Sequence, residues 1–260
     1  HVDDHFIGEK YVASTAPTIN VEVNGTSPLE KIELYRGTEL IHRKDMYESL
    51  KENSVRILWT GASRRWSYSG IVWKGTVTIK GGDIEKIEKI RFDSPRSHFK
   101  LISDGIIEFE SWTCGYPSGF VIDFEKGSNP EISVVLDSYL ISNESKFGDD
   151  VKLNQKTDSV IPRAGFLAEA KMTLADGDST KIDISLEELS EGSVSLPMGG
   201  LNRKIEIGKT PMTSLFAGEV SYTDHDIHPG VNPYWAKITQ QDMEMAWVSP
   251  VFASYYPLDV

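Results

Sequence analysis

The sequence predicts a mainly β protein built from antiparallel β-sandwiches, with few short helices. Period-two alternation of apolar and polar residues is its dominant pattern, and 12 prolines and 21 glycines divide a chain of 260 residues of which 39% are hydrophobic. Closely spaced short strands with turn signals between them favour sandwiches or barrels. No series of long amphipathic helices alternates with these strands, which argues against a parallel α/β enzyme core.

The clearest strand covers residues 73–80, where Trp73, Val77 and Ile79 alternate with lysine and threonine before a Gly-Gly-Asp turn. Further strands are expected at 19–23, 32–34, 40–41, 84–92, 106–112, 120–124, 132–136, 168–174, 205–207, 234–240 and 245–252. The spacing slips within 84–92, which indicates a bulge or a short helix. Short helices are expected at 44–51 and at 185–192, and the polar stretch 143–162 is expected to be a loop.

Composition excludes several classes of partner. Lysine and arginine total 27 against 39 acidic residues, a formal net charge of −12 with a pI near 5.0, whereas nucleic-acid binding needs a basic surface. No apolar run approaches the roughly 20 residues that cross a bilayer. The single cysteine, Cys114, allows no internal disulfide, so cytoplasmic and exported locations are both compatible. The polar start without methionine suggests a trimmed fragment without a signal peptide.

Four stretches resemble one known group of proteins. They are KYVASTAP at 10–17, LWTG at 58–61 continuing through WKG and GGDI to residue 84, SWTCG at 111–115, and NPYWAKITQ at 232–240 leading into AWVSPV. Together they are similar to the C-terminal β-rich region of an uncharacterised family, a domain of unknown function, in long microbial proteins. The front part of those proteins resembles PHP-type metal-dependent hydrolases. Ala16 stands where the family usually has glycine.

The resemblance implies that any catalytic part lies outside this chain. PHP-type catalysis uses a front domain rich in His and Asp metal ligands, and the six histidines here do not match that set. The implied partners are the N-terminal catalytic domain of the parent protein or a second copy of the chain. Pairing of the first and fourth stretches suggests an Ig-like sandwich of residues 1–45 and 210–260, with 46–209 as a large β-rich insertion.

The best candidate metal ligands are Asp224, His225, Asp226 and His228, because carboxylates and imidazoles this close in sequence suit a divalent cation. The alternative is a polar loop before Pro229. A second cluster, at His1, Asp3, Asp4 and His5, is explained more simply as a frayed terminus.

The candidate recognition loop holds Arg64, Arg65, Trp66 and Tyr68, whose aromatic and guanidinium groups suit sugar rings or a protein interface. Trp59 and Trp73 are expected in the core instead.

Two other candidates have simpler explanations. Cys114 could be a nucleophile, but no histidine is its neighbour in the sequence. It is better explained as a small buried apolar residue. Glu108 and Glu110 invite a glycosidase interpretation but fit the solvent face of a half-buried strand.

We therefore expect a non-catalytic accessory, binding or oligomerisation module of a larger PHP-like hydrolase. The alternatives are a metal-dependent hydrolase that uses the 224–228 cluster, and a carbohydrate-binding module that uses Trp66 and its neighbours.

Overall fold

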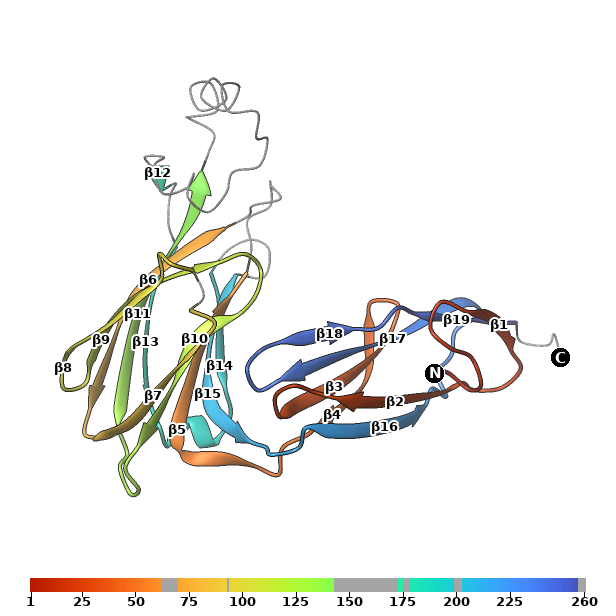
Figure 1. Cartoon of the computed structure of the whole chain (residues 1–260), viewed down its shortest axis with the longest axis horizontal. Helices are drawn as coiled ribbons and strands as arrows, with labels where there is room; N and C mark the ends of the chain where they lie inside the picture. The colour runs from red at the N-terminus through yellow and green to blue at the C-terminus, as the bar shows by residue number, and fades with distance from the viewer. Residues whose placement is uncertain (62–69, 93, 143–172, 175–177, 199–202, 257–260) are drawn as a thin grey trace. The chain divides into compact units, whose positions relative to one another are not determined.

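The computed structural model describes residues 1–61, 70–92, 94–142, 173–174, 178–198 and 203–256 (Figure 1). These residues form nineteen strands and one turn of 3-10 helix, arranged in several mainly antiparallel sheets. The predicted fold class, mainly β with antiparallel sandwiches, is confirmed. In this described part of the chain, no helix is long and apolar enough to cross a membrane.

The chain divides into two compact units. Unit 1 consists of His1–Lys51 and Pro211–Val260, and unit 2 consists of Glu52–Thr210. The sequence predicts the corresponding boundaries at 45/46 and 209/210, a few residues away. We describe each unit by itself.

Unit 1 is a sandwich of a large sheet and a two-stranded sheet. The large sheet has the order β1-β19-β17-β3-β4 with β18 paired to β17, and the small sheet is β16-β2. The strands are β1 (Lys10–Ala13), β2 (Thr18–Asn24), β3 (Leu29–Arg36), β4 (Glu39–Asp45), β16 (Ala217–Thr223), β17 (Gly230–Gln240), β18 (Met245–Trp247) and β19 (Val251–Tyr255).

The order of the large sheet is that of an immunoglobulin-like sandwich. Strands β19, β17, β3 and β4 occupy the places of G, F, C and C′, with β2 and β16 as B and E on the other sheet. β1 runs parallel to β19, and the other pairs are antiparallel. The inward side chains of Leu34, Tyr234 and Val251 are buried, as the period-two alternation of these strands requires.

Unit 2 is a second sandwich. One sheet has the order β14-β15-β5-β10-β7, and the other has β8-β9-β6-β11, whose open side pairs with β13 and β12. The strands are β5 (Ser49–Thr60), β6 (Ile71–Lys80), β7 (Ile84–Ile90), β8 (His98–Ser103), β9 (Ile106–Thr113), β10 (Ser118–Phe124), β11 (Glu131–Ser142), β12 (Thr173–Leu174), β13 (Asp178–Ser185), β14 (Val194–Pro197) and β15 (Lys204–Met212).

Aromatic side chains fill the core of unit 2. The fully buried Trp59 stacks on Phe109 with ring centroids 4.5 Å apart and meets Phe120 edge-on. Trp73 is also fully buried, and its Nε1 donates to Thr113 Oγ1 at 2.7 Å, which satisfies its polar atom. The prediction that both tryptophans belong to the core is confirmed.

Some of the predicted strands and helices are present in the structure, and others are not. The helix predicted at 44–51 is wrong, because Lys44 and Asp45 pair with β3 and residues 49–51 begin β5. Strand 84–92 exists as β7 with a bulge in its pairing to β10. Of the helix predicted at 185–192, only the 3-10 turn η1 (Glu188–Ser190) is present. Ser185 and Glu188 form reciprocal hydrogen bonds, in which the N–H of Ser185 donates to Glu188 Oε2 and the N–H of Glu188 donates to Ser185 Oγ. Most of strand 168–174 and all of loop 143–162 lie outside the described residues.

Close strand packing in unit 2 leads to a prediction at Gly119. A Cβ at this position would overlap the carbonyl oxygen of Ile57, a backbone atom that cannot move without displacing β5. We expect Gly119→Ala to lower the free energy of unfolding of unit 2 by about 3 kcal/mol, the upper part of the overpacking range. Urea denaturation followed by hydrogen exchange measures this loss.

Gly208→Ala is the matched control. Its Cβ would approach only the side chain of Ser193, at 3.0 Å, so a much smaller change is expected. Equal losses from the two substitutions would contradict the steric explanation.

Candidate functional site

The predicted metal cluster lies in the loop that joins β16 to β17 in unit 1. Within this loop Asp224 is almost fully buried, whereas His225, Asp226 and His228 are exposed. The four side chains therefore occupy different environments, although they are adjacent in sequence.

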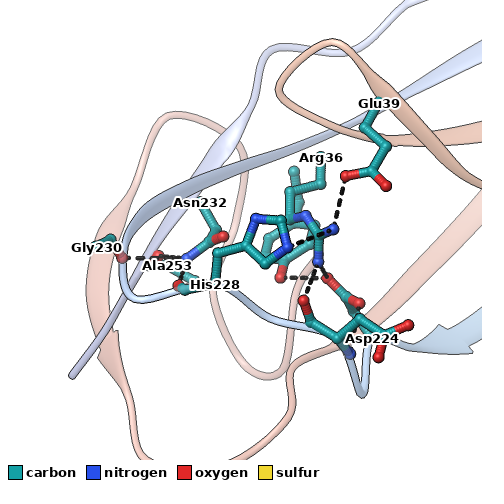
Figure 2. Close-up of polar contacts among 9 residues, drawn as sticks. Arg36, Glu39, Asp224, His228, Gly230, Asn232 and Ala253 are labelled. Carbon is teal, nitrogen blue, oxygen red and sulfur yellow. Dashed lines mark hydrogen bonds and ion pairs between the residues drawn. The ribbon is translucent and has the colours of Figure 1, made fainter. Parts of the chain in front are cut away.

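Asp224 forms a buried ion pair with Arg36, the last residue of β3 (Figure 2). Arg36 Nη1 lies 2.8 Å from Asp224 Oδ2, and the two side chains are 6% and 2% exposed. The partners are 188 residues apart in the chain. Removing one partner of such a pair leaves a buried charge without compensation, which costs about 3–5 kcal/mol.

Arg36 has further partners around its guanidinium group. Nη1 also donates to the carbonyl oxygen of Asp226 at 2.6 Å, and Nη2 donates to Glu39 Oε2 at 2.6 Å. His228 Nε2 lies 3.4 Å from Nη2, as an acceptor in its neutral form. Burial alone would lower the pKa of Arg36, but Glu39 and Asp224 outweigh it and raise the pKa, so the charge is secure.

The Asp224 carboxylate is saturated by donors from this unit. Oδ2 also accepts the hydroxyl of Tyr234 at 2.8 Å, and Oδ1 accepts the backbone N–H of Asp226 at 3.1 Å. The backbone N–H of Asp224 donates to Pro17 next to β2. Burial, together with the hydrogen bond and charge of Asp224, raises the pKa of Tyr234 well above its ordinary value.

Asn232, the third residue of β17, closes the other end of the loop. It is buried, and its Nδ2 lies 2.7 Å from the His228 carbonyl, 3.1 Å from that of Gly230 and 3.4 Å from that of Ala253 on β19 (Figure 2). The loop is therefore fixed to three strands of the large sheet through Arg36, Tyr234 and Asn232.

We call the contacts of Arg36, Asp224, Tyr234 and Asn232 the anchor, because they hold the loop on the sheet. They do not bring the four predicted ligands together around one point. Across the described residues, no group of three or more His, Cys, Asp or Glu side chains is placed to hold a metal ion. A cation at Asp224 would have to replace Arg36 and Tyr234 as partners of the carboxylate. The exposed side chains of His225, Asp226 and His228 are the part of the predicted cluster that remains open to solvent.

The other candidates from the sequence are distributed as follows. Arg64, Arg65, Trp66 and Tyr68 lie outside the described residues. The N-terminal cluster is tied down, in contrast to the expected frayed end: Asp3 accepts from the Tyr11 hydroxyl and the Thr18 N–H at 2.8 and 2.9 Å, and Val2 between His1 and Asp3 is buried.

Cys114 and the glutamate pair have no catalytic geometry. Cys114 is exposed just after β9, so the expectation of a buried apolar cysteine is wrong, and desolvation raises the pKa of its thiol, the reverse of activation. Glu110 lies 3.0 Å from Lys74 Nζ and accepts from Trp112 Nε1. Although burial acts to raise it, the pKa of Glu110 is lowered by these contacts. Glu108 is exposed two residues away, as expected for the solvent face of a strand.

A surface that the sequence did not reveal lies on the large sheet of unit 1, on the side away from its core. We call it the outer face. Strand register aligns its side chains in five cross-strand rows, which are Val12–Ser254–Val231, Lys10–Phe252–Pro233, Trp235–Tyr35–Leu40, Trp247–Lys237–Glu33–Arg43, and Met245–Thr239–Lys31–Asp45.

The first three rows form an apolar half. Its most exposed members are Val12 (69%), Val231 (60%) and Leu40 (47%). At its centre, the rings of Tyr35 and Trp235 stack at 4.2 Å with an angle of 8° between their planes. Trp235 Nε1 donates to the carbonyl of Gly37 at 2.7 Å, which fixes the indole in place. Rigid aromatic groups of this kind act as anchors at protein interfaces because little entropy is lost when they bind.

The last two rows form a charged half around Glu33. Its carboxylate oxygens lie 3.6 Å from Lys31 Nζ and 3.6 Å from Lys237 Nζ, and Arg43 pairs with Asp45 at 2.6 Å. The Glu33 side chain is only 9% exposed, and its Oε2 accepts no hydrogen bond from the described residues. The positive charge of Lys237, 3.6 Å from this same oxygen, compensates its charge without a hydrogen bond.

One sequence signal could have indicated this face. Residues 233–236 are apolar on both sides of the strand, since Tyr234 and Ala236 point inward while Pro233 and Trp235 point outward. When one face of an antiparallel sheet is exposed to solvent, apolar and polar residues normally alternate along each strand. Apolar residues on both faces indicate that the second face also meets a partner.

No protein-family model matches the chain, and no curated protein is significantly similar to it. The likeness to the region behind PHP-like domains therefore remains a resemblance of motifs.

The Tyr234 hydroxyl provides a direct test of the anchor. We expect Tyr234→Phe to lower the free energy of unfolding of unit 1 by about 1.5–3 kcal/mol, the range for a hydrogen bond to a charged group. Tyr222→Phe is the control, because the described contact of that ring is its stack on His42, which phenylalanine retains. Urea denaturation measures both variants, and equal stability of Tyr234→Phe and wild type would contradict the anchor.

The same variant should change the alkaline limit of stability. The folded pKa of Tyr234 is raised above its unfolded value, so from about pH 10 upward the unfolded chain loses the tyrosine proton while the folded chain retains it. Stability from this group is complete below pH 10 and is lost as the pH rises toward the folded pKa. Melting temperatures between about pH 9 and 11 should fall less steeply in Tyr234→Phe than in wild type.

Proposed function

We propose that the chain is a non-catalytic accessory module of a larger, PHP-like protein and that it acts by macromolecular association. The observation that supports this function is the outer face of unit 1. It combines exposed aliphatic side chains with a fixed Tyr35–Trp235 stack, which is the composition of a protein interface core beside a charged rim.

The anchor explains how the chain maintains this surface. Arg36 and Asp224 join β3 to the β16–β17 loop, and Asn232 joins that loop to β19. Strands β3, β17 and β19 supply most of the residues of the outer face, so the alignment of its rows depends on the strand register that the anchor maintains. The predicted metal residues thus contribute to binding indirectly, as structural supports.

In the parent protein, this module would lie behind the hydrolase part and bind either that part or another copy of itself. The hydrolase chemistry belongs in this proposal to the front part, in keeping with the motif resemblance at 10–17 and 232–240. Association through a sheet face requires no catalytic group in this chain.

Footprinting of the intact parent protein tests the proposal. Trp247 and Val231 are each 60% exposed in this chain, so hydroxyl radicals should label them readily in a dilute sample of the chain alone. We expect several-fold less labelling of both residues in the parent protein, because a partner covers the outer face. Leu101 on β8, 50% exposed, is the internal control and should be labelled equally in both samples. Unchanged labelling of Trp247 and Val231 would overturn the proposal.

A metal and activity assay separates the competing hydrolase function. The chain alone should bind no stoichiometric Mn²⁺ or Zn²⁺ and should not hydrolyse p-nitrophenyl phosphate in their presence. If the chain alone showed metal-dependent turnover, and His225→Ala and His228→Ala abolished it, the chain would be an enzyme and not an accessory module. Both side chains are exposed, so these variants are expected to fold normally.

A further inference from the structure

We propose that the outer face of unit 1 binds an acidic surface of a different protein, one that presents carboxylates beside an exposed apolar side chain. This inference rests on the proposed function and states the chemistry of its partner. It follows from the positive charge that the face carries within an acidic chain, and from the spacing between its aromatic and cationic groups.

The cations of unit 1 are concentrated on this face. Its five rows contain four of the seven lysines and arginines of residues 1–51 and 211–260, but only two of the fifteen acidic residues. The cations are Lys10, Lys31, Arg43 and Lys237, and the carboxylates are Glu33 and Asp45. The face is therefore net positive, whereas the remainder of unit 1 is strongly negative. An acidic partner is attracted to the outer face and repelled by the rest of the unit.

The exposed part of the charged half is mainly cationic. The side chains of Lys31 and Lys237 are 22% and 26% exposed, whereas the Glu33 carboxylate that they share belongs to a side chain only 9% exposed. In the apolar half, Lys10 is exposed, with its ammonium group 5.8 Å from the centre of the Phe252 ring. The carboxylates of a partner therefore meet cations in both halves of the face.

The aromatic stack and the nearest cation have a spacing that one partner segment can match. Trp235 and Lys237 are two residues apart on β17 and point to the same side, so their Cα atoms are about 7 Å apart. A partner that places an apolar side chain on the Tyr35–Trp235 stack brings a carboxylate to Lys237 if the two residues are i and i+2 of a strand. Residues i and i+4 of a helix have a similar spacing.

The same charges disfavour an extended polyanion as the partner. Nucleic-acid sites commonly neutralise about 6–10 phosphates, whereas this face has an excess of only two cations. A nucleic acid or an anionic membrane would also lie against the acidic remainder of unit 1. A compact acidic patch on a protein avoids that repulsion, and its apolar side chains can cover Val231 and Leu40, which are 60% and 47% exposed.

A labelled random copolymer of glutamate and tyrosine, with glutamate in excess, is a suitable probe for the full 260-residue chain. Fluorescence polarisation should show saturable binding, about tenfold tighter than the binding of polyglutamate, which has the charge without the aromatic groups. The bound copolymer should reduce hydroxyl-radical labelling of Trp247 and Val231, and the labelling of Leu101 should not change.

Paired substitutions test which part of the chain binds the copolymer. Lys10→Glu with Arg43→Glu reverses two exposed cations of the outer face and should weaken binding about tenfold or more. Lys89→Glu with Lys100→Glu is the matched control, because it changes the net charge equally at exposed positions of β7 and β8. This control should bind within about twofold of wild type. Circular dichroism checks that both variants are folded.

The outcomes distinguish this inference from the proposed function. No saturable binding of the copolymer, or equal losses in the two paired variants, would overturn the acidic partner. Tighter binding to heparin or to phosphatidylserine vesicles than to the copolymer would overturn a protein as the partner. If the copolymer did not bind while the parent protein still protected Trp247 from labelling, this inference would fail and the proposed function would stand.

Discussion

The buried ion pair between Arg36 and Asp224 is the interaction on which unit 1 depends. It joins the end of β3 to the loop before β17, and Tyr234, Glu39 and the Asp226 backbone complete the hydrogen bonds of both charged groups. A pair of this kind is stable only when its remaining donors and acceptors are satisfied. Here they are satisfied by three strands and one loop, so the charges fix the relative positions of these elements within the sandwich.

This constraint connects the interior of the sheet to its exposed side. In a strand, adjacent residues point to opposite faces, so Tyr35 and Trp235 project outward because Arg36 and Tyr234 are held inside. The stacked aromatic pair and the row of Lys237, Glu33 and Arg43 are thus set by the same register as the anchor. A binding surface on a rigid sheet requires little ordering when a partner arrives, which favours affinity.

The sequence predicted the architecture better than the site. Alternation along residues 73–80 and 234–240 identified strands that the structure contains, whereas the helix at 44–51 failed because pairing with β3 outweighed local preference. The 224–228 cluster was noticed for its residue types, but its role depends on Arg36, whose proximity no local pattern discloses. Predicting the outer face requires the cross-strand register of β1, β19, β17, β3 and β4, which no local pattern contains. The only signal in the sequence is that part of β17 is apolar on both sides.

A double-mutant cycle on Arg36→Met and Asp224→Asn tests the central role of the ion pair most directly. Hydrogen exchange of β17 amides in urea is the suitable readout, because the two units of the chain need not unfold together. We predict that each single variant lowers the stability of unit 1 by about 3–5 kcal/mol. The double variant should lose far less than their sum, with a coupling of about 2 kcal/mol or more. Additive losses, or a single Asp224→Asn variant as stable as wild type, would contradict the account.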